Sequence, residues 1–422
     1  MLKHFFSDQP QILKRITALT TILIVAIVGT ILLTGSHAST PYVSLNADKG
    51  TLTSGATSQA CSGASDGQCV QFGSSISGGG GNPACTQTLS PGADIGAAIG
   101  NASAGSVICL NSGNYTGSVD VRSSHATATA PITVTSTNPS SPAVIANETS
   151  VFYGANYVTF TRLTFDWAMP KPWACWGTDG NTISGQIISE PYSAGTCQAG
   201  TANPADHVQI AVDAAHTSFT YDDINSEGTN ICMNMGNYGG RAQYTLIDHS
   251  RIHGCGPPMI SGWGGSVNAQ WGWHAHGIYD YGDFTTITNS YIYGSSRNGL
   301  LFYPSGTGAV AKNNVIDGNG NGVTFDGDTN VTVSNNIITN STSPLGYADY
   351  GATVGSGGAG SGTALSNNCM GGNKSGDISV SGVTVSGNKT GINPLYVDAA
   401  NHNYKLQAGS PCVGYGPDTA QP

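Results

Sequence analysis

The chain has 422 residues, of which 59 are glycine and only 9% are charged. Many turns and few ion pairs favour a β-rich secreted protein over a helical cytosolic one. Without residues 1–38, eleven basic and 23 acidic residues remain, a net charge of −12. This balance argues against nucleic acid as a partner, and it disfavours a polyanionic glycan unless local arginine or bound Ca²⁺ offsets it.

The first 38 residues have the composition of a secretory signal. Basic residues precede an apolar run over residues 16–33, and the small residues of "SHAST" suit cleavage after Ala38. The run is about 18 residues long, close to the length that spans a bilayer, so an uncleaved signal anchor is the alternative. We expect an extracellular protein, secreted or at the cell surface, that meets a membrane only through this segment if it is retained.

Residues 39–84 are rich in Gly and Ser ("SSISGGGGNPA"), which predicts a linker or a small decoration. Pro91 can then start a helix, in which Ile95, Ala98 and Ile99 would share one face. A short amphipathic helix at this place predicts a cap over the open end of a solenoid core.

Repeats decide the predicted fold. Segments such as "LIDHSRIHGCG", "TITNSYIYGSS", "VAKNNVIDGNG" and "VTVSNNIITNS" recur with steps of 40, 24 and 22 residues, and the longest step contains an insertion. Together with "FTYDDINSEG", we register them on Asp222, His249, Asn289, Asn313 and Asn335. A second strand recurs between them as "NICMNM", "HGIYDY", "NGLLFY" and "NGVTFD". A period near 22 residues with short strands predicts the coils of a parallel β-helix.

Stacking such coils would bury apolar side chains that a single coil cannot bury. Alternation within the second strand predicts these inward side chains: Ile278, Leu300, Phe302, Val323 and Phe325. At the bend, an amide ladder is expected from the stacked residues Asn289, Asn313 and Asn335.

Residues 85–415 resemble the secreted right-handed parallel β-helix superfamily, which includes pectate and alginate lyases, polygalacturonases, mannuronan epimerases and phage tailspikes. The repeats carry this resemblance, and the ending "GINPLYVDAANHNYKLQAGSPCVGYG" is similar to the closing segment of many such proteins. The resemblance implies an all-β, right-handed parallel β-helix solenoid with an N-terminal capping helix and a polysaccharide partner. Residues 416–422 form a tail, and we expect a monomer.

Ten cysteines in an exported chain favour disulfide bonds. No pair has CxxC spacing, so a zinc site is not expected. Pairing near neighbours predicts five bonds: Cys61–Cys69, Cys85–Cys109, Cys175–Cys197, Cys232–Cys255 and Cys369–Cys412.

Two insertions interrupt the predicted coils, over residues 167–206 and 255–273. Between them they hold or border all six tryptophans, of which Trp167 is the first. Long loops on a rigid solenoid tend to line its working face, and exposed aromatic rings suit stacking on sugars. The alternative is that the rings pin the loops onto the coils. The predicted substrate-binding tryptophans are Trp173, Trp176, Trp263, Trp271 and Trp273.

Aligning the second strands predicts which side chains share the outer face. We match Ile231 with Ile278, Leu300 and Val323. In this register Asp280 points inward. The outward positions then hold Cys232, Tyr279, Leu301 and Thr324, followed by Asn234, Tyr281, Tyr303 and Asp326.

A face with His, Tyr, Arg and acid suits proton abstraction next to the carboxyl group of a uronate. That reaction needs a cation, a base and an acid. The predicted catalytic residues are Arg297 for the carboxylate, His276 as base, Tyr279 or Tyr281 as acid, and His274 beside them, with Tyr303 as a substrate-binding residue. The set resembles the His/Tyr/Arg/Asp set of mannuronan epimerases and some lyases.

Metal binding is the other option for these side chains. His274 and His276 could share a transition metal because residues i and i+2 of a strand face the same way, although no third ligand is fixed by spacing. Asp326 and Asp328 in "DGDTN" form a candidate Ca²⁺ site, or plain turn chemistry. No other cofactor is expected.

Two classes of function remain open. The leading hypothesis is an exported polysaccharide lyase or epimerase that acts on uronate-containing glycans. The alternatives are a non-catalytic glycan-binding or adhesin-like surface protein and a polygalacturonase-like hydrolase, of which Asp222-Asp223 and "AHG" are reminiscent. An enzyme needs His276, Arg297 and a tyrosine around one point, whereas a binder needs only exposed tryptophans.

Overall fold

The structure, a computed structural model, describes residues 84–166, 208–227, 231–236, 240–256, 275–342 and 349–417, with the backbone of five short strands outside these ranges. The chain divides into two compact units, residues 1–79 and 80–422. In the first unit the described strands β1 (Thr57–Ala60) and β2 (Gln68–Gln71) form an antiparallel pair. Across all described residues, no helix is long and apolar enough to cross a membrane. The predicted signal segment lies outside these residues.

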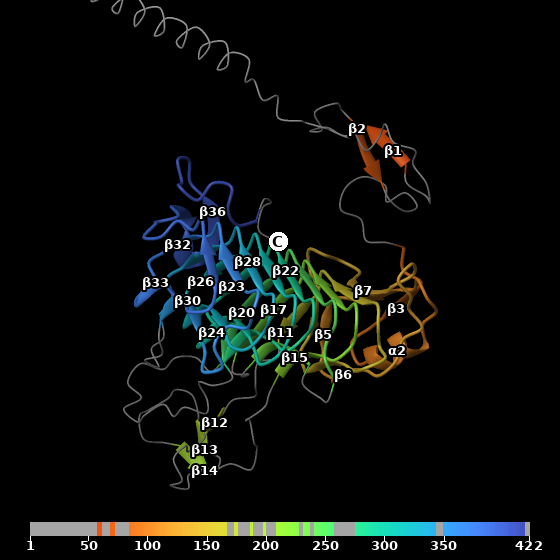
Figure 1. The fold of residues 1–422 in the computed structure, drawn as a ribbon. Coiled ribbons are helices and arrows are strands. Elements are labelled where there is room, and N and C mark those ends of the chain that lie inside the picture. The colour runs from red at the N-terminus through yellow and green to blue at the C-terminus, as the bar shows by residue number, and fades with distance from the viewer. Residues whose placement is uncertain are drawn as a thin grey trace, which may run out of the picture. The chain divides into compact units, whose positions relative to one another are not determined.

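The second unit is built from three long parallel sheets that the chain visits in turn, once per coil (Figure 1). In the described ranges, sheet 1 consists of β3 (Gln87–Leu89), β4 (Val107–Leu110), β7 (Ile132–Ser136), β10 (Val158–Thr161), β16 (Ser218–Thr220), β19 (Leu246–Asp248), β22 (Thr286–Thr288), β25 (Val310–Lys312), β28 (Thr332–Ser334), β31 (Ala364–Ser366) and β34 (Thr384–Ser386). Sheet 2 consists of β5 (Gly113–Tyr115), β8 (Ala143–Ile145), β11 (Thr164–Asp166), β17 (Asp223–Glu227), β20 (Arg251–Gly256), β23 (Tyr291–Tyr293), β26 (Val315–Asp317), β29 (Ile337–Thr339) and β32 (Cys369–Gly371).

Sheet 3 consists of β6 (Val119–Val121), β9 (Thr149–Val151), β15 (Val208–Val212), β18 (Ile231–Met235), β21 (His276–Asp280), β24 (Asn298–Phe302), β27 (Asn321–Phe325), β30 (Tyr350–Val354) and β33 (Gly376–Ser379). Two small antiparallel sheets complete the described strands of this unit, one of β12 (Trp173–Cys175), β13 (Gln186–Ile188) and β14 (Cys197–Ala199), the other of β35 (Tyr396–Asp398) and β36 (Asn403–Leu406). A 3-10 helix, η2 (Ala399–Asn401), joins the last two strands. The predicted parallel β-helix is confirmed.

One hydrophobic core runs along the inside of the coils. The predicted inward residues are all at most 1% exposed: Ile278, Leu300, Phe302, Val323 and Phe325. Neighbouring coils stack rings directly, as Phe160 does on Phe219 with centroids 5.2 Å apart. Each coil therefore buries its apolar face against the next, which is why the repeat period predicts the fold.

The helix α2 (Ile95–Asn101) closes the N-terminal end of this core. Its Ile95 and Ile99 side chains are buried, as the sequence pattern predicts. The helix begins later than Pro91 suggests, because the Asp94 carboxylate is the N-cap and accepts the Ala97 N–H at 2.8 Å.

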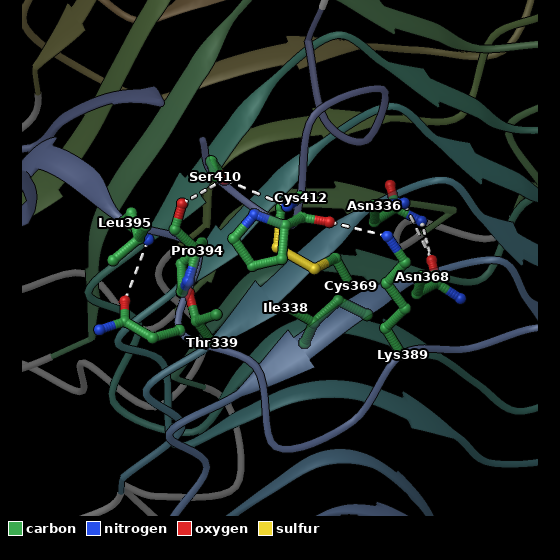
Figure 2. Close-up of a disulfide and its surroundings, with 12 residues drawn as sticks. Asn336, Ile338, Thr339, Asn368, Cys369, Lys389, Pro394, Leu395, Ser410 and Cys412 are labelled. Atoms are coloured by element: carbon green, nitrogen blue, oxygen red, sulfur yellow. Dashed lines mark hydrogen bonds between the residues drawn. A yellow bond between two sulfur atoms is a disulfide. The ribbon is translucent and has the colours of Figure 1, made fainter. Parts of the chain in front are cut away.

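The bend between sheets 1 and 2 is made of two residues with different tasks. The first is left-handed, as in Asn335 with φ of 56°. The second is buried and forms the amide ladder: the Asn314 amide donates to Asn336 Oδ1, and the Asn336 amide donates to Asn368 Oδ1, each at 3.0 Å (Figure 2 shows the second bond). The ladder therefore lies one residue later than predicted, because a left-handed residue turns the following side chain into the core. The prediction was wrong for Asn289, Asn313 and Asn335.

The predicted register was also wrong in the earlier coils. Tyr221, not Asp222, is the left-handed equivalent of His249. Asp222 takes the ladder position, where its Oδ1 accepts the Leu163 N–H at 2.9 Å, so its role at the bend is structural. Burial raises the pKa of its carboxyl well above the usual range.

In sheet 3, Ile231 pairs with His276, and Met233 pairs with Ile278. Cys232 is consequently buried in the core instead of facing outward. The physical reason is an apolar patch on the outer face of β15 and β18, where Ile231 packs with Val208 and Ala211. Hydrophobicity does not distinguish inside from outside there.

Disulfides link neighbouring elements of the coils. Three predicted pairs are confirmed, Cys85–Cys109, Cys232–Cys255 and Cys369–Cys412. The side chains of the other two predicted pairs, Cys61–Cys69 and Cys175–Cys197, lie outside the described residues.

The closing segment, residues 392–415, covers part of the outer face of sheet 2. Tyr404 packs there with Tyr291 and with the Cys369–Cys412 disulfide in a second apolar cluster. In Figure 2 the disulfide lies beside Lys389, whose ammonium donates to the Pro411 carbonyl at 2.8 Å. The segment is thus fixed to the coils by packing and by a covalent bond.

Candidate active site on sheet 3

Both long insertions enter the solenoid at one corner, between sheets 2 and 3. Residues 167–207 connect β11 to β15, and residues 257–274 connect β20 to β21. The second insertion leads directly into His276 at the start of β21. The predicted positions that lie outside the described residues are the side chains of His274, Trp167, Trp173, Trp176, Trp263, Trp271 and Trp273.

Three predicted side chains meet on the outer face of sheet 3. The rings of His276 and Tyr279 lie 5.5 Å apart between centroids, and Tyr279 lies 5.9 Å from Tyr303 in an edge-to-face arrangement. The His276 side chain has no exposed surface, whereas Tyr279 and Tyr303 are partly exposed. A ligand on this face would therefore meet the two tyrosines first.

The Tyr279 phenol is held in its protonated form. Burial raises its pKa well above the usual value of 10, and the negative charges of Asp326 and Asp328 and the neighbouring Tyr303 add to the effect. At neutral pH this side chain is therefore a proton donor.

Arg297 lies one coil beyond Ala275, the residue that precedes His276. Its backbone N–H donates to the Ala275 carbonyl at 2.9 Å, and its side chain is partly exposed. The predicted one-coil separation from His276 is therefore correct.

Tyr281 has a cationic partner that the sequence analysis did not single out. The Arg241 guanidinium lies 4.6 Å from the centre of the Tyr281 ring, and its Nη1 forms an ion pair with Asp283 at 3.1 Å. The sequence predicts this contact, because Arg241 precedes Tyr281 by 40 residues. This is the repeat step from His249 to Asn289, so the two residues take the same position in successive coils. This arginine is the second cation beside the predicted site.

Asp280 lies inward, as predicted, and is fully buried. Its Oδ1 accepts the Gly282 N–H at 3.0 Å and the Thr285 hydroxyl at 2.9 Å. Burial raises its pKa to about 7, and the nearby Asp328 contributes to this. Burial likewise raises the pKa of Asp328 to about 7.

The candidate Ca²⁺ ligands already accept backbone hydrogen bonds. Asp326 Oδ1 accepts the Gly357 N–H at 2.5 Å, and Asp328 Oδ1 accepts the Gly306 N–H at 2.6 Å. In the described part of the chain, no group of three or more His, Cys, Asp or Glu side chains is placed to hold a metal ion. Calcium usually takes six to eight oxygen ligands, so the observed contacts lend this site no support and it stays a prediction.

The sequence matches no protein-family model and no curated protein. Similar solved structures include an alginate lyase from Paenibacillus sp. str. FPU-7, at 17% identity with a TM-score of 0.41, covering 71% of this chain and 100% of that one. The pectate lyase Pel9A has 14% identity and a TM-score of 0.45, covering 80% and 93%. The A-module of the Azotobacter vinelandii mannuronan C-5 epimerase AlgE6 has 13% identity and a TM-score of 0.29, covering 70% and 94%. These TM-scores are all below 0.5, so the evidence for the parallel β-helix is the three parallel sheets of this chain. Its activity has to be inferred from its own side chains.

Proposed function

We propose that this protein is an exported carbohydrate-active enzyme, a lyase or epimerase that acts on uronate-containing polysaccharide. The observation that carries the proposal is the contact of His276, Tyr279 and Tyr303 on the outer face of sheet 3. This face follows the corner where both insertions enter. The disulfides are compatible with export.

Tyr279 is the group that suits contact with the sugar. It is partly exposed and protonated, so it can donate a proton to the oxygen that leaves when the glycosidic C–O bond breaks. His276 lies behind it without exposed surface. We therefore assign His276 a positioning role through Tyr279, and it stays the predicted base, the group that would take the proton from the uronate carbon.

A uronate carboxylate has to be neutralised before the neighbouring carbon gives up its proton. Within the described residues, Arg297 and Arg241 lie beside the site. Arg241 lies against the Tyr281 ring, and Arg297 is partly exposed one coil from His276, the predicted site residue nearest to Tyr279. We therefore assign the carboxylate to Arg297.

The test is the absorbance of unsaturated uronates released from a panel of acidic polysaccharides, with proton exchange at the uronate carbon as the readout for epimerisation. Tyr279→Phe and Arg297→Ala are expected to lower either rate by about a hundredfold or more. Tyr153→Phe and Arg122→Ala repeat the same chemical changes at exposed positions elsewhere and are expected to leave it unchanged. Equal rates for Arg297→Ala and wild type on every active polymer would refute the assignment.

A non-catalytic glycan-binding protein is the second candidate. The complete burial of His276 favours it, because a catalytic base has to reach its substrate. Glycan binding without either turnover signal, unaffected by Tyr279→Phe, would support this candidate over the enzyme.

A further inference from the structure

A second group of titratable side chains lies on the outer face of sheet 2, beside the part of that face that the closing segment covers, since Tyr293 stacks on both His253 and His402. Asp223 stands on β17, and Arg251 and His253 stand on β20. In the sheet register Arg251 is directly opposite Asp223, and His253 is two residues further along. One carboxylate can therefore reach both side chains of the next coil.

The contacts in this group are short and share one carboxylate. Asp223 Oδ1 lies 2.8 Å from His253 Nε2, and Asp223 Oδ2 lies 2.8 Å from Arg251 Nη2. The His253 ring also stacks on Tyr293, with centroids 4.8 Å apart and planes within 3°. The imidazole is thus fixed at its edge and across its face.

The carboxylate is ionised, and this sets the tautomer of the imidazole. Burial raises the Asp223 pKa, but the hydrogen bonds from His253 and Arg251 and the positive charge of Arg251 lower it, and the net shift is downward. An ionised carboxylate only accepts hydrogen bonds, so neutral His253 carries its proton on Nε2. Its Nδ1 then presents a lone pair.

Polar side-chain atoms of His253 and Arg251 are left without a hydrogen bond within the described part of the chain. His253 Nδ1 accepts no hydrogen bond there, and the guanidinium N–H groups of Arg251 other than the one on Asp223 donate none. The side chains are 22% and 36% exposed, so both can meet a ligand. A base and a cationic donor are held side by side by one carboxylate.

We propose that His253, Asp223 and Arg251 form a second site that hydrolyses esters of small acyl groups. A water molecule gives a proton to His253 Nδ1 while its oxygen bonds to the ester carbonyl carbon. The carbonyl electron pair moves to the oxygen, which the free Arg251 N–H groups stabilise. The ester C–O bond then breaks, and the imidazolium returns the proton to the leaving alkoxide. Water is the only co-reactant, and the products are an acid and an alcohol. Asp223 is a positioning residue in this scheme.

The same short segment offers an internal control. His249 Nδ1 lies 2.6 Å from Asp248 Oδ2, so this imidazole is also bonded to a carboxylate. The Asp248 carboxylate, however, is bonded by Thr288 and Asn289 instead of an arginine. His249 therefore has the orienting acid but lacks the cationic donor.

The test uses the full chain with 4-nitrophenyl acetate, compared with an equal concentration of free imidazole. We expect hydrolysis at least about tenfold faster than imidazole, lost in His253→Asn and retained within about twofold in His249→Asn. Arg251→Lys is expected to lower kcat more than it changes KM. Asp223→Glu is expected to retain more activity than Asp223→Asn, which a merely structural role would not require.

Three results would overturn the proposal: wild-type hydrolysis no faster than imidazole, an equal loss in both histidine variants, or no loss in His253→Asn. Thermal melting of each variant shows whether it is folded, and the His253→Gln variant serves as the second probe if His253→Asn is not. The outcome is independent of uronate turnover, because Tyr279→Phe is expected to leave ester hydrolysis unchanged. An inactive sheet 3 site with an active ester site, or the reverse, distinguishes the two proposals.

Discussion

Two corners of the coil bury polar side chains in opposite ways. At the corner between sheets 1 and 2, the Asn336 amide accepts from Asn314 and donates to both Ala311 and Asn368. At the corner between sheets 3 and 1, Asp280 has one bonded oxygen, and its Oδ2 has no partner within the described residues. The first corner holds the coils in register at any pH, whereas the second holds a proton and weakens the fold once that proton is lost.

Asp280→Asn tests the second corner and is expected to have the largest effect. In the unfolded chain this carboxyl ionises with a pKa near 3.8, whereas the folded protein keeps the proton up to about pH 7. The contribution of Asp280 to the free energy of unfolding therefore falls as pH rises from about 4 to about 7 and is constant above pH 7. The neutral amide removes this loss, so the free energy of unfolding should rise by at most about 4 kcal/mol at pH 8 and by close to zero at pH 4.

Urea denaturation of the wild type and the variant at pH 4, 6 and 8 measures this difference. Asp398→Asn, at an exposed carboxyl near the C-terminus, is the matched control. A gain of the same size at all three pH values would contradict the protonation argument.

Asn336→Ala tests the amide ladder at the corner between sheets 1 and 2. It leaves the Asn314 amide and the Ala311 carbonyl without their buried partner and removes the ladder's link to Asn368. Unsatisfied buried groups of this kind cost about 1–3 kcal/mol each, so we expect a loss of about 3 kcal/mol. The loss should be the same at pH 5 and pH 8, since no ionisable group takes part. Lys312→Ala, exposed beside the preceding bend, should change stability by less than about 0.5 kcal/mol, and an equal loss there would count against the ladder.

The fold could be predicted from the sequence because its two signals are local. The repeat step gives the coil, and alternation gives the core, as at Leu300 and Phe302. The register failed where that alternation is masked by apolar residues on the outer face, such as Ile231. The ladder was displaced by one residue because two adjacent asparagines, Asn335 and Asn336, read alike until backbone φ separates them.

The candidate sites were only partly predictable, because convergence depends on that register. Strand alternation predicted that Tyr279 and Tyr303 face outward, whereas His276 was predicted near them only because it lies just before the strand. The contact between Asp223 and His253 spans 30 residues and runs diagonally between two coils. Because the predicted register was wrong by one residue at Asp222, this contact could not be predicted. Side chains in the insertions follow no repeat, and the period says nothing about where they lie.

Substitutions of Asn335, the left-handed residue at the corner between sheets 1 and 2, are expected to have the smallest effect on the free energy of unfolding. They also allow the most direct comparison of backbone and ladder. Asn335 has φ of 56°, a region that Asn tolerates and Ala does not. Asn335→Ala should therefore cost about 1 kcal/mol, whereas Asn335→Gly should lie within about 0.5 kcal/mol of the wild type. Urea denaturation at pH 7 measures both variants. The two differ only by one methyl group, so the difference between them isolates the backbone from the neighbouring Asn336 ladder. If the alanine and glycine variants were equally stable, the bend would be held by its ladder alone, and the left-handed residue would be a consequence of the turn and not one of its causes.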